Sequence, residues 1–167
     1  MLFSRRYKKA NAGMDLITII IIITVLAISS IYGMKVFDDI NTDIQNDADL
    51  GNNSKELSSS LYDKYPSLFD SAILMAFILL TLFVVISVFL LDTHPVFFIV
   101  SVVLLLMVFL VTTLLANVYD DLMLDDDFSP YANEFPYTTW IMQNLLELSI
   151  AIGFIVLIVL FIKFRTS

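Results

Sequence analysis

The 167-residue sequence has no cysteine, one histidine, four glycines and four prolines. Without cysteine it cannot be a small secreted domain held together by disulfides. Charged residues make up 16% of the chain, against roughly 25% in an ordinary soluble domain. The net charge of −8 argues against a nucleic-acid binder, because contacts to phosphate need lysine and arginine. The single histidine, His94, forms neither a metal site nor a catalytic triad by itself.

What the sequence has instead is apolar residues, at 59% of the chain and with a mean hydropathy of +0.87. A chain of this size could not bury that much apolar surface in water, and it is too apolar to be disordered. A membrane-spanning helix needs about 20 apolar residues. Four segments qualify, at 16–34, 71–91, 96–116 and 145–162. We therefore expect an all-α integral membrane protein whose four transmembrane helices form two hairpin-like halves.

Turn and capping residues set the expected ends of these helices. Pro66 precedes Ser67 and Asp70, a spacing typical of a capping box that opens the second span. The segment 92–95 is short enough to make a tight turn between the second and third spans. Pro136 is expected to begin the last helix, because proline is tolerated in a first helical turn.

Lysine and arginine near the span ends predict the orientation. The two tails hold six basic residues, and the opposite side holds three: Lys35, Lys55 and Lys64. We therefore expect both termini on the cytoplasmic side. The tail residues could also contact anionic lipid or a partner protein; they are Arg5, Arg6, Lys8, Lys9, Lys163 and Arg165.

The acidity of the chain lies in two loops expected on the other side of the membrane. Residues 37–70 contain eight acids and two lysines, and residues 117–144 contain six acids and no base, so each loop carries a net charge of −6. The first loop is expected to be partly helical, since Phe37, Ile40, Ile44 and Ala48 recur at helical spacing. Gly51 and the asparagines after it are expected to end that helix before a second one starts at Ser54.

The two halves of the chain carry similar short segments. Residues 36–40 read Val-Phe-Asp-Asp-Ile and residues 118–122 read Val-Tyr-Asp-Asp-Leu, while Tyr65-Pro66 and Phe135-Pro136 precede the second and fourth spans. These matches suggest an internal duplication of residues 14–91 and 96–164. The alternative is that these short matches only reflect the aromatic and acidic residues that are common at the ends of membrane spans.

Glu147 is the one charged residue well inside an apolar run, and Gln143 and Asn144 share its helix face. Such a group could carry a proton or a cation through the membrane. Alternatively, Glu147 lies just beneath the headgroups and bonds to Gln143 or to a neighbouring helix.

The aspartates of the second loop could form a weak divalent-cation site at a subunit contact, because carboxylate oxygens suit Ca²⁺. Their spacing is not that of an EF-hand, and a solvated acidic loop is the alternative; they are Asp120, Asp121, Asp125, Asp126 and Asp127. The sequence contains no nucleophile-elbow, zinc-protease or phosphate-loop motif. We expect no enzymatic activity, no cofactor and no small-molecule substrate.

Three classes of function fit this outline: a structural membrane protein, a small channel, transporter subunit or lysis-type pore using Glu147, and a cell-surface module. The four-span claudin and tetraspanin families belong to the last class, but their loops carry cysteines and this chain has none.

In its topology, its turn Asp92-Thr93-His94-Pro95-Val96-Phe97-Phe98 and its aromatic-Asp-Asp segments, the chain resembles the small multi-pass proteins in the internal membrane of tailless icosahedral viruses. The resemblance implies a non-enzymatic minor virion membrane protein beneath a capsid, with its basic tails facing the capsid. Its partners would be lipid, further copies of itself and other membrane or capsid proteins, and not nucleic acid. A cellular membrane scaffold or assembly subunit is a further alternative.

Overall fold

The computed structural model describes residues 12–90 and 95–166, and every element in these ranges is a helix. The elements are α1 (Ala12–Asn46), α2 (Asn52–Leu90), α3 (Pro95–Leu124), α4 (Ser129–Ala132), α5 (Pro136–Gln143) and α6 (Leu145–Thr166). Within these residues four helices, α1, α2, α3 and α6, are long and apolar enough to cross a membrane. The prediction of an all-α, multi-pass membrane protein is confirmed at this level.

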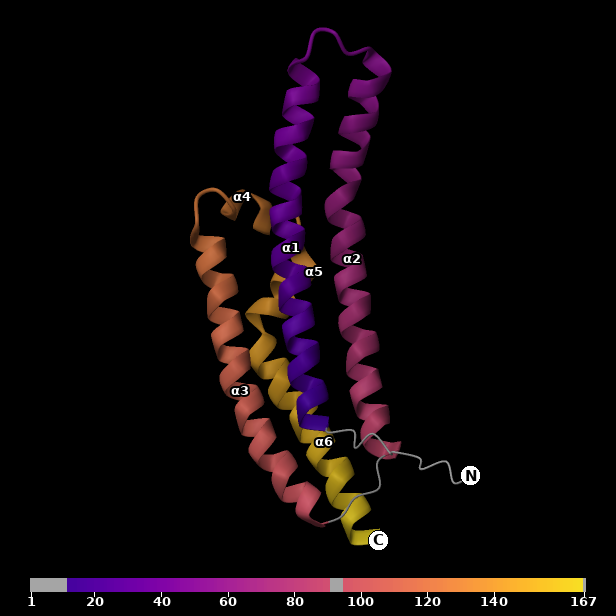
Figure 1. Ribbon diagram of the computed structural model, residues 1–167, viewed down its shortest axis with the longest axis vertical. Helices are drawn as coiled ribbons and strands as arrows, with labels where there is room; N and C mark the ends of the chain where they lie inside the picture. The colour runs from indigo at the N-terminus through magenta and orange to yellow at the C-terminus, as the bar shows by residue number, and fades with distance from the viewer. Residues whose placement is uncertain (1–11, 91–94, 167) are drawn as a thin grey trace, which may run out of the picture.

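Helix α1 forms the centre of the bundle and is the most buried of the four long helices. It packs along both α2 and α3, and α6 packs along α3 and α2 (Figure 1). The buried side chains of α1 repeat every three or four residues and so form one continuous stripe. They include Leu16, Ile20, Ile23, Ala27, Ile31 and Met34.

Hydroxyl groups inside the apolar segments mostly bond to the backbone of their own helix. Thr24 donates to the Ile20 carbonyl, and Thr112 donates to the Val108 carbonyl at 2.8 Å. The Thr112 hydroxyl also lies 3.3 Å from that of Ser149, which links α3 to α6. Most hydroxyl groups in the bundle are therefore satisfied locally, and the buried Thr81 hydroxyl on α2 is an exception among the described residues.

The first two helices are much longer than a bilayer is thick. With 35 and 39 residues, α1 and α2 measure about 52 and 58 Å at about 1.5 Å per residue, against roughly 30 Å of hydrocarbon. Both extend together beyond the other helices as a hairpin with a short turn at residues 47–51 (Figure 1). Helix α1 begins, and α6 ends, at the opposite end of the bundle.

Two expected helix boundaries were wrong. Pro66 does not open a helix, because α2 begins at Asn52 and runs through it. Pro136 does begin a helix, α5, but that helix ends at Gln143 and α6 starts at Leu145. Asn144 interrupts them with φ −106° and ψ 18°, outside helical geometry, and its side-chain amide donates to the Trp140 carbonyl. The predicted turn at 92–95 lies largely outside the described residues.

Candidate functional site

The candidate site is the end of the bundle at which the hairpin projects, and we refer to it as the head (residues 35–70 and 117–144). Polar contacts between α1 and α2 fix its outer part. The Gln45 side-chain amide lies 2.9 Å from the Lys55 carbonyl and 3.1 Å from the Ser59 hydroxyl. Lys55 Nζ donates back to the Gln45 carbonyl at 2.8 Å, and Ser58 donates to Asn41 Oδ1 at 2.8 Å. The two helices are therefore tied together close to the turn.

An aromatic cluster centred on Tyr65 fixes the base of the hairpin. Its ring stacks on Phe69 at 4.3 Å between centroids, lies 4.9 Å from Phe37 on α1, and meets Phe135 edge-on at 6.3 Å. Gly33 makes room for it, because a Cβ there would overlap the Tyr65 hydroxyl. The cluster joins α1, α2 and the residue before α5, the three segments that meet where the head begins.

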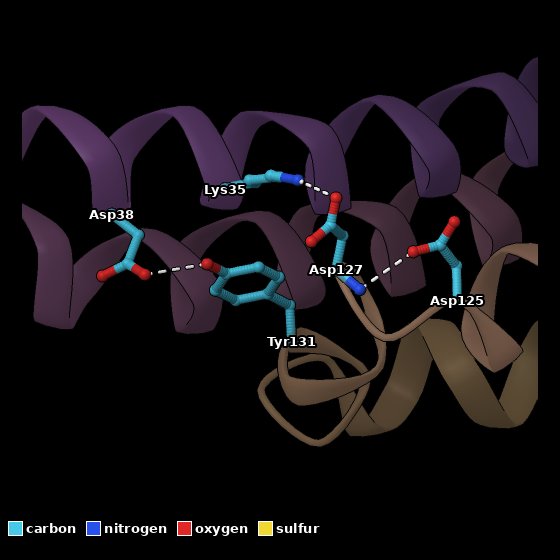
Figure 2. Close-up of polar contacts among 5 residues, drawn as sticks. All are labelled: Lys35, Asp38, Asp125, Asp127 and Tyr131. Atoms are coloured by element: carbon cyan, nitrogen blue, oxygen red, sulfur yellow. Dashed lines mark hydrogen bonds and ion pairs between the residues drawn. The ribbon is translucent and has the colours of Figure 1, made fainter.

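The connection between α3 and α5, residues 125–135, folds back onto α1 and is held there by several side-chain contacts. Figure 2 shows Tyr131 pointing at α1, where its hydroxyl donates to Asp38 Oδ2 at 2.8 Å. Asp127 Oδ2 lies 2.9 Å from Lys35 Nζ, and the Asp127 backbone N–H donates to Asp125 Oδ1. The Lys35 ammonium also lies over the Phe128 ring, 4.7 Å from its centroid.

These contacts shift the titration of Tyr131. Burial, followed by the hydrogen bond to the Asp38 carboxylate and that group's negative charge, raises the pKa of Tyr131 from 10.0 to about 12. The neutral phenol is favoured because it donates to the carboxylate, whereas a phenolate would repel it. The contact is therefore stable across the physiological pH range.

Asp70 is the most buried acid of the head, with 3% of its surface exposed. Its carboxylate on α2 accepts the backbone N–H groups of Tyr137 at 3.0 Å and Thr138 at 2.7 Å. These groups lie in the first turn of α5, where helix N–H groups have no partner within the helix. Asp70 therefore caps a helix that is distant in the sequence, and not its own.

An open cleft of about 240 Å³ lies beside this cap, lined by Asp63, Pro66, Ser67, Asp70, Ser71, Glu134, Pro136 and Tyr137. Ligand pockets are typically enclosed and about 300–1,000 Å³ in volume. The cleft is smaller and open, so its geometry does not favour an enclosed substrate site.

Comparisons with protein-family models, with curated proteins and with solved structures gave no match.

The aspartates expected to form a divalent-cation site do not converge. Asp127 pairs with Lys35, and Asp125 accepts a backbone N–H within the same turn. Within the described ranges, no three histidine, cysteine or acidic side chains are placed to hold a metal ion. A cation site formed by Asp120, Asp121, Asp125, Asp126 and Asp127 would need ligands from another chain, and it stays a prediction.

The intramembrane candidates lie on the outer surface of the bundle. Glu147 and Gln143 are exposed, and Asn144 is half-buried with its amide used at the helix interruption. No hydrogen bond or ion pair joins the Glu147 carboxylate to another described residue, so the expected bond to Gln143 is not formed in this chain.

The tail residues bear less on the site. Lys163 donates to the Phe89 carbonyl, near the last turn of α2, at 2.6 Å, and Arg165 is exposed. The predicted contacts of Arg5, Arg6, Lys8 and Lys9 lie outside the described residues.

The residues that organise the head do not stand out in the sequence. Lys35 and Asp38 were counted only as charges outside the membrane, Tyr131 was given no role beyond that of an interfacial aromatic, and Asp70 was expected to cap its own helix. Their partners are 67 to 93 positions away in the chain, and no local pattern encodes such pairs. The available signal was Asp70 itself, an acid at the very start of an apolar run, where a charge is costly without a partner.

Proposed function

We propose that this chain is a non-enzymatic structural membrane protein, a minor virion membrane protein that organises a bilayer beneath a capsid. The observation that supports the proposal is the head: a projecting two-helix hairpin tied at Gln45 and Lys55, and braced at its base by the 125–135 connection. A stiff projection on four apolar helices suits a part that spaces or anchors other molecules.

The interior of the bundle also favours a structural role over transport. The described residues that face it are mostly apolar, and the buried hydroxyls largely bond to their own helices. A transport path needs polar or ionisable groups facing the bundle interior. Glu147 faces outward instead, so it does not line a path between these four helices, and we do not favour the alternative of a channel or lysis-type pore.

In the proposed arrangement both termini are on the cytoplasmic side, where they meet the capsid, and the head is on the opposite side. Most of the acids of residues 37–70 lie on the hairpin. Acidic surfaces repel phosphate, so the head would hold nucleic acid away from the bilayer. A cellular membrane scaffold would use the same geometry in a different membrane.

The deciding experiment is density-gradient fractionation of the native source, with mass spectrometry of this chain across the gradient. We expect it to migrate with intact particles at a constant ratio to the coat protein. Migration with host membranes would refute the virion assignment and leave the cellular scaffold.

The orientation can be tested separately, because a chain without cysteine accepts single reporter thiols. Asn53→Cys at the hairpin turn and Arg165→Cys at the end of α6 are labelled in sealed vesicles with a membrane-impermeant maleimide. We expect only Arg165→Cys to react when the cytoplasmic face is outside. Reaction of only Asn53→Cys would reverse the orientation.

A further inference from the structure

The exposed face of α6 is apolar except at one end. Phe154 and Ile158 are 60% and 57% exposed, and Glu147 and Ala151 are exposed in line with them. At 100° per residue these four side chains fall within a narrow sector of the helix. Glu147 therefore belongs to the surface that α6 presents to lipid.

Two estimates place Glu147 beneath the membrane surface. Ser149 lies opposite Thr112 of α3, and the apolar run of α3 continues for five more residues to Asn117. At about 1.5 Å per residue, Glu147 then lies about 5 Å below the level of Asn117. Measured from the other end, 16 residues separate it from Lys163, about 24 Å along a hydrocarbon layer of roughly 30 Å.

A carboxyl group at this depth needs a hydrogen-bonding partner, because lipid chains supply none. Most hydroxyl groups within the bundle find theirs within the chain, as Thr112 and Ser149 do, although the buried Thr81 hydroxyl does not. Glu147 has none among the described residues, and Gln143, which is also exposed, belongs to α5 on the other side of the interruption at Asn144.

A second copy of the chain supplies the matching groups at the same depth. Two copies inserted in the same orientation are related by a twofold axis along the membrane normal, so each residue meets its own counterpart at its own level. Glu147 then faces the Glu147 of the second copy, where a protonated carboxyl can donate to its ionised counterpart, so the patch is complementary to itself. Ala151, the next residue on this face, is small enough to let two helices approach closely.

We propose that the face of α6 bearing Glu147 and Ala151 binds the same face of a second copy within the bilayer. The interface goes beyond the proposed function and does not require a virion. It makes pairs of bundles whose projecting hairpins point the same way.

Disulfide cross-linking in liposomes tests the interface. Ala151→Cys places a thiol at the expected contact, and Leu110→Cys is a matched control, since Leu110 is 63% exposed on α3 at the same depth by the Thr112–Ser149 contact. Each variant is reconstituted without other proteins at a low protein-to-lipid ratio and oxidised. We expect at least tenfold more dimer from Ala151→Cys than from Leu110→Cys.

The role of the carboxyl group is tested in the Ala151→Cys background. Adding Glu147→Leu should lower the dimer yield to that of Leu110→Cys, whereas Glu147→Gln should keep most of it, because an amide can both donate and accept. Equal yields from the two thiol positions, or a yield that Glu147→Leu leaves unchanged, would overturn the proposal. Those results would assign Glu147 to lipid headgroups or to a different partner. Because no coat protein is present, they would leave the proposed virion role untouched.

Discussion

Removal of the Asp70 carboxylate should destabilise α5 more than any other single change in the head. Helix α5 begins with Pro136, which has no N–H, and the Thr139 N–H already bonds to the Phe135 carbonyl. Of the N–H groups in the first turn, those of Tyr137 and Thr138 need an outside acceptor, and Asp70 accepts both.

The expected magnitude follows from these two bonds. A hydrogen bond to a charged group contributes about 1.5–3 kcal/mol, and a buried donor left without an acceptor costs about 1–3 kcal/mol. Thr138 is fully buried, so water cannot replace its lost acceptor, whereas exposed Tyr137 can recover one from solvent. We expect Asp70→Ala to lower the free energy of unfolding by about 3 kcal/mol, and Asp70→Asn, which keeps one acceptor oxygen, by about half as much.

The single tryptophan provides the assay, since Trp140 lies within α5 itself. Its fluorescence is followed while the protein in detergent micelles is unfolded with sodium dodecyl sulfate. The matched control is Ser67→Ala, one turn before Asp70, which should change the unfolding free energy by less than about 0.5 kcal/mol. If a helix began at Pro66 instead, Ser67→Ala would cost about 1 kcal/mol as a lost cap. Equal effects of Asp70→Ala and Ser67→Ala would refute the assignment of Asp70 to α5.

Three further changes probe the head by the same unfolding assay. Gly33→Ala should destabilise by about 1–3 kcal/mol, because the overlap with Tyr65 outweighs the gain of about 1 kcal/mol in helix propensity; a net stabilisation would contradict the packing. Because folding raises the Tyr131 pKa from 10.0 to about 12, its stabilising contribution is complete below pH 10 and is lost as the pH rises through 12. Between these pH values the unfolding free energy of Tyr131→Phe should therefore fall less than that of the wild type. An equal fall in both proteins would refute the contact. Asp127→Asn should cost less than about 1 kcal/mol, and less still at high salt, because its pair with Lys35 is partly exposed.

The apolar runs located all four membrane helices because bilayer thickness alone sets their minimum length. The helix boundaries near Pro66 and Asn144 could not be predicted from the apolar runs in the same way. Pro66 is a strong local signal for a helix start, yet α2 continues through it. Around it, Tyr65 packs against α1 and Asp70 bonds to α5, and this tertiary packing outweighs the local preference for a start at Pro66.

The interruption at Asn144 was also beyond the sequence pattern. The apolar run from residue 145 and the proline at 136 together predict one continuous last helix, because nothing between them is a strong helix breaker. The Asn144 amide instead bonds to the Trp140 carbonyl, a local alternative to helix that asparagine readily adopts. The prediction of Glu147 as an intramembrane acid needed only the run itself, but its outward direction depended on how α6 packs.

Apolar side chains cannot drive helices together in lipid, which is as apolar as they are, so polar groups and close packing decide which surfaces meet. In this chain Asp70 is used to hold α5, and Thr112 and Ser149 join α3 to α6, while Glu147 is left on the outside. Folding and self-association should therefore respond to different residues. Asp70→Ala should lower the unfolding free energy of the monomer, and Glu147→Leu should abolish dimers without changing it. The two changes should then be additive when combined, because the groups share no partner; a strong coupling between them would show that α5 and the outer face of α6 act as one unit.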